Sequence, residues 1–318
     1  ESGGSTSVAE TGTTDTFTVV LNAQPDSDVV LSITSSDTGE ATVTSALTFT
    51  SGNWDTAQTV TVTGVDDNLI DGTITSTITV AVNDGSSDNN FDPVADQTVS
   101  VTTADNDVAG FTITETSGST SVAESGSTDT FAVVLDAQPA SDVVLSITSG
   151  DTGEATVNGS TSSNNILTFT SGNWDTPQSF TVTGVDDNLV DGTITSTLTV
   201  AVVDALSEDS FDAVADQTVS TTTTDNDTAG FTIVQSGGST SVAETGTTDT
   251  FTIVLNAQPA SNVVIAISSN DTGEATVNSP LTFTPANWNS AQTVTVTGIN
   301  DNLVDGTITS TITVAVND

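Results

Sequence analysis

The residues Val60-Thr61-Val62-Thr63-Gly64-Val65-Asp66-Asp67 decide the fold of this chain, because they contain both of its recurring patterns. Valine alternates with threonine as far as Gly64, and two acids follow shortly afterwards. A period of two places the valines on one face of an extended strand and the threonines on the other. The stretch therefore predicts a half-buried β-strand that ends in a pair of carboxylates.

The same alternation returns along the rest of the chain, and no run has a helical period. Other strands are predicted around Phe17, Val19 and Leu21; Val29, Leu31 and Ile33; Ile74, Ile78, Val80 and Val82; Val99 and Val101; and Phe111 and Ile113. Turn-forming clusters such as 22–26 and 51–53 separate them. About seven short strands per unit predict an all-β, antiparallel Greek-key sandwich, with Trp54 and Phe17 as the largest core residues.

The chain consists of three near-copies of one segment. Thr6-Ser7-Val8-Ala9-Glu10 returns at 120–124 and at 240–244, and Trp54 returns as Trp174 and Trp288. A polar insertion at about 158–165 in the second copy predicts a surface loop. A repeat of about 115 residues has the size of a whole sandwich domain. We therefore predict a tandem array: repeat 1 (1–108, first strand missing), repeat 2 (109–228, complete) and repeat 3 (229–318, C-terminal strand missing).

The composition restricts the function. There is no Lys, Arg or His to balance 42 Asp and Glu, and Cys, Met and Tyr are absent. Without these residues the usual nucleophile–base pairs cannot be built, so we expect no enzyme. A net charge of −42 disfavours nucleic acid as a partner, and no apolar run is long enough for a membrane span. With no initiator Met and no signal peptide, we expect an interior window of a longer protein or a processed one.

The acids gather where the predicted strands end. In repeat 1 they are Glu10, Asp66, Asp67, Asp71, Asp105 and Asp107; in repeat 2 they are Glu124, Asp186, Asp187, Asp191, Asp225 and Asp227. If the sandwich brings these loops to one end, the carboxylates repel one another, by about 4 kcal/mol for a pair at 4 Å and an effective dielectric of 20. The chain has no basic side chain to relieve this, so protons or metal ions must do so.

Carboxylate oxygens on loops favour calcium. The absence of His and Cys excludes the usual zinc, copper and haem sites. Calcium accepts six to eight oxygen ligands in flexible geometry, whereas magnesium keeps much of its water. The alternative is that the acids are simply solvated in a protein adapted to salty surroundings. Their recurrence at matched strand ends favours calcium.

Three separated motifs together resemble the Calx-beta domain. They are Ser7-Val8-Ala9-Glu10, the stretch 60–67, and Asp105-Asn106-Asp107-Val108-Ala109-Gly110-Phe111. The resemblance covers essentially the whole chain and implies immunoglobulin-like sandwiches that bind calcium at one tip. Carried over position by position, it implies the twelve acids named above as ligands, with Glu244, Asp301 and Asp305 in repeat 3.

The chain also departs from that family. Many Calx-beta domains carry an acidic Asp-Tyr element in the middle of the domain. This chain has Thr38-Gly39-Glu40-Ala41 there instead, so whether this region supplies a ligand stays open. In repeat 3, Asn300 replaces the first acid of the pair, and a closing Asp-Asn-Asp is missing. We expect a weaker site there.

Asp-Asn-Asp also lies between consecutive repeats, and only about three residues are expected to separate the last strand of one repeat from the first strand of the next. A bound ion would therefore fix two domains relative to each other. We predict a calcium-rigidified stalk, fibre or adhesin extender, whose partners are calcium and neighbouring repeats of the same chain. In a variant of this hypothesis, identical chains form a filament by completing each other's sheets through strand addition; the favoured alternative is that the incomplete ends belong to a segment of a longer array. Weak sites with dissociation constants of about 10⁻⁴ to 10⁻³ M would fill outside cells, which predicts an extracellular or cell-surface location. The alternatives are a calcium-dependent module that binds glycan, ice or a host surface through exposed threonines, and a carboxylate glycosidase, which acids gathered around a metal disfavour.

Overall fold

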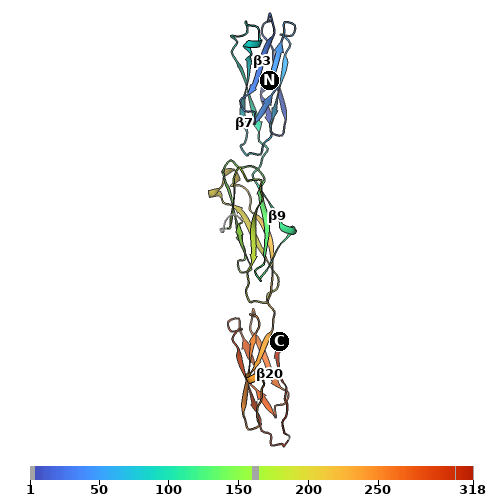
Figure 1. Cartoon of the computed structure of the whole chain (residues 1–318), viewed down its shortest axis with the longest axis vertical. Coiled ribbons are helices and arrows are strands. Elements are labelled where there is room, and N and C mark those ends of the chain that lie inside the picture. Colours follow the sequence, from blue (N-terminus) through green and yellow to red (C-terminus); the bar gives the residue numbers. More distant parts are fainter. Residues whose placement is uncertain (1–3, 160–164, 305, 318) are drawn as a thin grey trace.

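The computed structural model describes residues 4–159, 165–304 and 306–317, and the chain is almost entirely β-structure. Three elongated β-units follow one another along the long axis of the molecule (Figure 1). Each unit has its own hydrophobic core, and these cores lie within repeats 1, 2 and 3 apart from small contributions at the junctions. The predicted all-β array of immunoglobulin-like sandwiches is confirmed.

The strands follow the predicted alternation. Repeat 1 contains β1 (Thr6–Ala9), β2 (Thr14–Val19), β3 (Val29–Ser35), β4 (Ala41–Val43), β5 (Ala46–Phe49), β6 (Gln58–Gly64), β7 (Ile74–Val82) and β8 (Gln97–Ala104). Repeat 2 contains β9 (Phe111–Glu115), β10 (Thr120–Ala123), β11 (Thr128–Leu135), β12 (Val143–Ser149), β13 (Ala155–Gly159), β14 (Ile166–Phe169), β15 (Gln178–Gly184), β16 (Ile194–Val202) and β17 (Gln217–Thr224). Repeat 3 contains β18 (Phe231–Gln235), β19 (Thr248–Leu255), β20 (Val263–Ser269), β21 (Ala275–Val277), β22 (Leu281–Phe283), β23 (Gln292–Gly298) and β24 (Ile312–Val316).

Single-turn 3-10 helices interrupt these strands. They are η2 (Asp84–Ser86), η3 (Thr116–Gly118), η4 (Asp204–Leu206), η5 (Asp209–Phe211) and η6 (Ser236–Gly238). In the described part of the chain, no helix is long and apolar enough to cross a membrane.

Repeat 2 shows the architecture most fully. One sheet has the order β10-β17-β16-β12-β14, the other β13-β15-β11-β9, and the core lies between them. Two sequence expectations need correction here: nine strands form instead of about seven, and β10 pairs with β17 in parallel rather than antiparallel. The parallel pair arises from a kink at η3, where Ser117 (φ 58°) and Gly118 (φ 80°) turn the first strand from one sheet into the other. β1 and β8 form the same parallel pair in repeat 1.

The cores contain the inward residues of both sheets. Phe17 is buried as expected, but Trp54 is only half-buried, so its assignment as a leading core residue is wrong. Trp54 instead accepts a hydrogen bond through its backbone carbonyl from the Leu21 N–H (3.1 Å), and its counterparts Trp174 and Trp288 do the same. The largest fully buried side chains are phenylalanines such as Phe49, Phe169 and Phe283.

Repeats 1 and 3 have smaller sheets than repeat 2. Repeat 1 has a three-stranded sheet β2-β6-β4, without a neighbour of the β9 type among the described residues. Repeat 3 has a three-stranded sheet β22-β20-β24 where repeat 2 has five strands. The repeat boundaries at 108/109 and 228/229 stay predictions, and most of the predicted insertion loop (160–164) lies outside the described residues.

Consecutive repeats touch through a backbone clasp and an apolar side chain. The Gln138 N–H donates to the Asn68 carbonyl (2.7 Å), and the side chain of Ile70 packs against the core of repeat 2. At the next junction the Gln258 N–H donates to the Asn188 carbonyl (2.7 Å), and Val190 lines an apolar pocket of repeat 3. The linker runs from 105 to 110, longer than the expected three residues, because β8 ends at Ala104.

Candidate metal centre

Glu10 is placed at the tip of repeat 1 by the parallel strand pair. Its backbone N–H donates to the Ala104 carbonyl (3.1 Å), which continues the β1–β8 ladder by one residue. The side chain is 1% exposed, and one carboxylate oxygen accepts the Asn106 N–H (3.2 Å). The other oxygen, Oε1, is buried and has no hydrogen-bond partner among the described residues.

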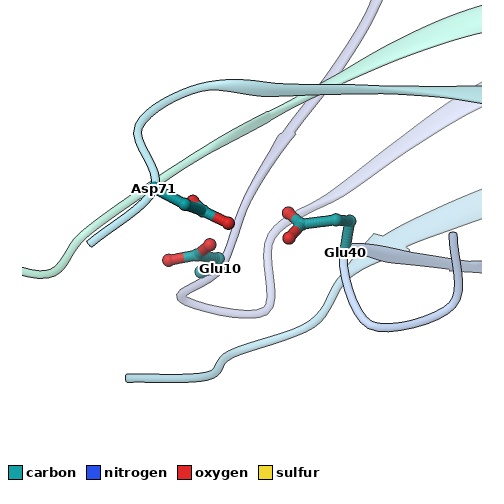
Figure 2. A group of neighbouring side chains, drawn as sticks. All are labelled: Glu10, Glu40 and Asp71. Atoms are coloured by element: carbon teal, nitrogen blue, oxygen red, sulfur yellow. The ribbon is translucent and has the colours of Figure 1, made fainter. Parts of the chain in front are cut away.

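Glu40 enters the same tip from the opposite sheet. Its carbonyl accepts the Val65 N–H (2.9 Å) just past the end of β6, which fixes the residue at the start of β4. Its side chain is 6% exposed, and Oε2 is buried without a partner in the described chain. Figure 2 shows the carboxylates of Glu10, Glu40 and Asp71 turned toward one another, and their closest oxygens lie within 4.8 Å of each other.

Asp105 and Asp107 complete the cluster from the linker. They form a second group with Glu10, again with oxygens within 4.8 Å, so Glu10 is shared by both groups. Asp105 accepts the N–H groups of Gly72 (2.8 Å) and Asp107 (2.6 Å), which ties the linker to the β6–β7 loop. Asp107 has a buried oxygen, Oδ2, without a partner among the described residues.

Repeat 2 builds a similar arrangement, except that Asp187 takes the place of the counterpart of Glu10 in one of its two groups. Glu124 groups with Asp225 and Asp227, and Glu154, the counterpart of Glu40, groups with Asp187 and Asp191. Asp225 accepts the Gly192 N–H (2.9 Å), and Glu124 accepts the Asn226 N–H (3.1 Å). The site therefore follows from the repeat sequence and occurs twice in the described residues.

Burial and mutual repulsion disturb the titration of these carboxyls. Burial, reinforced by the charges of Asp71 and Glu10, raises the pKa of Glu40 to about 7. Burial also raises the pKa values of Glu10, Asp71 and Asp107, and neighbouring acids add to each shift. The pKa values of Glu124, Glu154, Asp191 and Asp227 are raised for the same reasons. Without a cation, the ionised form of each of these groups is therefore less favourable than that of a solvated carboxyl.

The residues present fit a hard divalent cation. The groups supply only carboxylate oxygens, and several oxygens are buried and unpaired although a buried polar atom normally finds a partner. Calcium takes oxygen ligands from flexible loops, as these residues would provide. Glu10, Glu40, Asp71, Asp105 and Asp107 would hold the ion or ions in repeat 1.

The structure brings most of the predicted residues together, but not all. Asp66 is exposed and belongs to neither group. Asp67 also stays outside both groups, although its counterpart Asp187 joins one in repeat 2 while accepting the equivalent backbone hydrogen bond (2.7 Å from Leu69, 2.6 Å from Leu189). Asp186 accepts a hydrogen bond from the Asn226 side chain (2.8 Å) and also stays outside the groups. In repeat 3, Glu244 and Asp301 are only half-buried and form no such group within the described chain; Asp305 lies outside the described residues.

Sequence reasoning left Glu40 and Glu154 open, and the structure places both in the clusters. A signal was present: Thr-Gly-Glu-Ala-Thr-Val recurs unchanged at 38–43, 152–157 and 272–277. A glutamate retained directly before a buried strand, in a chain with no basic residue, is expected to face other carboxylates or a cation.

Comparisons with known proteins identify structural neighbours only. No protein-family model matches the chain, and no curated protein sequence matches it. Among solved structures, domains 4 and 5 of the S-layer protein SbsC are 19% identical with a TM-score of 0.31, covering 61% of this chain and 70% of that one. The calcium-binding domain CBD12 of CALX1.1 is 14% identical with a TM-score of 0.26, covering 63% and 78%. CBD12 of CALX1.2 is 13% identical, also with a TM-score of 0.26, covering 69% and 97%.

Proposed function

We propose that the chain is a non-enzymatic structural array outside the cell, a stalk, fibre or adhesin extender, in which calcium stiffens the junctions between repeats. One observation carries the proposal: Ile70, which packs on the core of the next repeat, directly precedes Asp71, a member of the acid cluster. The same adjacency recurs at Val190 and Asp191. Cation binding and junction packing therefore involve one loop.

The physical link is electrostatic. Without a cation, the ionised carboxylates repel one another and push the β6–β7 loop away from the linker. A bound calcium ion would replace this repulsion by ligand bonds to both segments and hold Ile70 in its contact with repeat 2. Removal of calcium would free the loop and loosen the junction, while the core of each sandwich keeps its packing.

The location follows from affinity. Carboxylate sites on extracellular modules typically bind calcium with dissociation constants of about 10⁻⁴ to 10⁻³ M, which suits the concentrations outside cells. The lack of Lys and Arg supports the same role, since trypsin-type proteases find no cleavage site. In this proposal, 1–108, 109–228 and 229–318 are separate folding units, and the partners are calcium and neighbouring repeats, with contacts between identical chains as an extension.

A surface-binding module is the second candidate. Its supporting observation is a ladder of hydroxyl side chains on the outer face of β7 and β8, where Thr75 pairs with Thr102 and Thr77 with Ser100. Repeat 2 has the same ladder at Thr195–Thr222 and Thr197–Ser220. Outward threonine is also an ordinary choice for a strand, so this reading requires a ligand. Substituting Thr75 and Thr77 with Val and assaying glycan binding and ice-growth inhibition would test it.

The calcium proposal is tested by thermal unfolding of the full 318-residue chain in EDTA, then with calcium and, separately, magnesium. We expect a calcium-specific rise in the unfolding temperature and a longer, less variable particle in small-angle X-ray scattering. An equal response to sodium at matched ionic strength would identify general charge screening. No response to either divalent ion would sink the proposal and leave the acids as solvated loops.

A further inference from the structure

In repeat 2, the strand that follows the η3 kink lies directly beside the strand by which the chain leaves the repeat. β10 pairs in parallel with β17, from Thr120 opposite Thr221 to Ala123 opposite Thr224. The Glu124 N–H extends this ladder by donating to the Thr224 carbonyl (3.1 Å). β1 and β8 form the same pair in repeat 1. The pairing is therefore a property of the repeat.

Both strands run from the end of repeat 2 that faces repeat 1 to the end that faces repeat 3. Phe111, the first residue of β9, follows the linker from repeat 1, and its carbonyl accepts a hydrogen bond from the side chain of Gln217, the first residue of β17. At the other end, β17 leads into Asp225 and Asp227, and repeat 3 begins its first strand at Phe231. A pull on repeat 2 through its two neighbours would therefore draw β10 toward repeat 1 and β17 toward repeat 3.

Tension of this kind acts along the two strands. They can separate only by sliding past each other, so the hydrogen bonds between them are loaded together. A force applied to both strands at the same end would instead break these bonds one after another. Since the barrier to separation contains every bond that breaks in the same step, sliding is slower than peeling at equal force.

β10 is also held along its other edge. The N–H groups of Ser121 and Ala123 donate to the side chains of Asp129 (2.8 Å) and Ser127 (2.7 Å), which lie at the start of β11. β15 packs closely on the same strand, because a Cβ atom at Gly184 would lie 2.1 Å from the Ala123 carbonyl oxygen. Although β10 has only four residues, it is therefore anchored to both sheets.

We propose that the β10–β17 pair is a shear clamp, a strand pair loaded lengthwise that makes repeat 2 resist tension, and that an ion bound by Glu124, Asp225 and Asp227 reinforces it. Glu124 directly follows β10, the two aspartates follow β17, and their closest oxygens lie within 4.8 Å of one another. An ion that binds all three joins the ends of the two strands, so sliding must also remove its ligands. The clamp consists of backbone hydrogen bonds and is independent of calcium; the reinforcement rests on the proposed calcium function.

The test is single-molecule force spectroscopy on the full 318-residue chain, with handles attached through introduced cysteines. The chain has no cysteine of its own, so each pair of substitutions fixes where the force acts. Ser119→Cys with Thr228→Cys loads the start of β10 against the end of β17 and shears the clamp. Ser125→Cys with Thr228→Cys loads both strands at the same end and peels it. All three positions are exposed.

In EDTA, we expect the sheared pair to unfold at least about tenfold more slowly than the peeled pair at equal force, because several hydrogen bonds must break in one step. Equal rates would overturn the clamp, since thermodynamic stability alone does not depend on the direction of pulling. Val108→Cys with Thr228→Cys adds β9 to the loaded path and should unfold about as slowly as the sheared pair. A far slower rate for this third pair would assign the main resistance to β9 and also overturn the clamp.

Calcium tests the reinforcement. The unfolding rate of the sheared pair should fall about another tenfold in calcium, within the usual range for coupled sites. With Asp225→Asn and Asp227→Asn added, this gain should vanish while the difference between shearing and peeling remains in EDTA. A gain that persists in this variant, or no gain in the parent, overturns the reinforcement and leaves the clamp standing. If calcium raises the unfolding temperature but does not slow unfolding under force, the reinforcement fails and the proposed calcium function stands.

Discussion

Glu10 and Glu40 come from opposite sheets of one sandwich and place carboxylate oxygens within 4.8 Å of each other, with one oxygen of each buried and unpaired among the described residues. Two such groups cannot both be ionised without a cation except at a high free-energy cost. This pair therefore makes the tip of the repeat a place where either protons or metal must accumulate.

Replacement of Glu40 by Gln should stabilise the metal-free protein and weaken its binding of calcium. In EDTA at neutral pH, Glu40→Gln removes a buried carboxyl and should raise the unfolding temperature of repeat 1. In calcium it removes a ligand and should weaken binding at least about tenfold, which corresponds to 1.4 kcal/mol. Calorimetric titration and thermal unfolding measure both effects. Asp55→Asn, an exposed acid outside the groups, is the matched control and should change neither.

The metal-free protein should become less stable as pH rises toward neutrality. The pKa of Glu40 has the ordinary value of 4.5 in the unfolded chain and is raised to about 7 in the folded protein. The folded state therefore holds more protons across that window, and the free energy of unfolding falls as pH rises through it. The affinity for calcium should rise as the pH rises through the same window, because protons compete with calcium for the carboxylate.

Two other acids determine how the free energy of unfolding changes with pH on the acid side. Hydrogen bonds from the Ser7 and Asn90 N–H groups lower the pKa values of Asp15 and Asp88 respectively. These two groups stabilise the folded state at pH values above 3.8, the pKa of the unfolded chain. The stabilisation is lost as the pH falls through their lower pKa values in the folded state. Urea unfolding in EDTA should thus show a maximum at about pH 4 to 5. A maximum at neutral pH in EDTA would contradict the assignment of raised pKa values.

Gly64→Ala should destabilise repeat 1 and disturb its acid cluster. A Cβ atom at Gly64 would lie 2.1 Å from the carbonyl oxygen of Ala9, the residue before Glu10. Because the obstacle is backbone, β1 would have to move, at a cost of about 3 kcal/mol or more. Denaturant unfolding measures the loss. Gly52→Ala meets only Thr50 Oγ1 at 3.8 Å and should stay within about 0.5 kcal/mol of the parent protein.

Ile70→Ser should loosen the first junction without unfolding either repeat. The substitution removes an apolar contact with the core of repeat 2, worth about 1 to 2 kcal/mol, and leaves Asp71 in place. In calcium, small-angle scattering should show a broader distribution of lengths. The calcium affinity of repeat 1 should fall by no more than the coupling between ion and junction, because that coupling is reciprocal. Val94→Ser, at a valine that is 48% exposed, is the control. An unchanged length distribution for Ile70→Ser would show that the backbone clasp alone maintains the junction.

Local patterns predicted much of the structure. Strict alternation, as in 58–64, located the strands and their buried faces because a side-chain period of two leaves only two choices for each strand. The recurrence of acids after those strands predicted the loop positions of the clusters. The parallel pairing of β10 with β17 was not predicted, because it depends on a kink that moves the first strand to the other sheet.

The sequence by itself determined the all-β repeat, the strand faces and a charge that only protons or external cations can balance. Only the tertiary structure decided that Glu40 joins Glu10, that Asp66 stays outside, and that Ile70 reaches the next core. The physical reason is distance along the chain. Alternation and turn chemistry act between near neighbours, whereas these contacts depend on how two sheets and two consecutive repeats pack together.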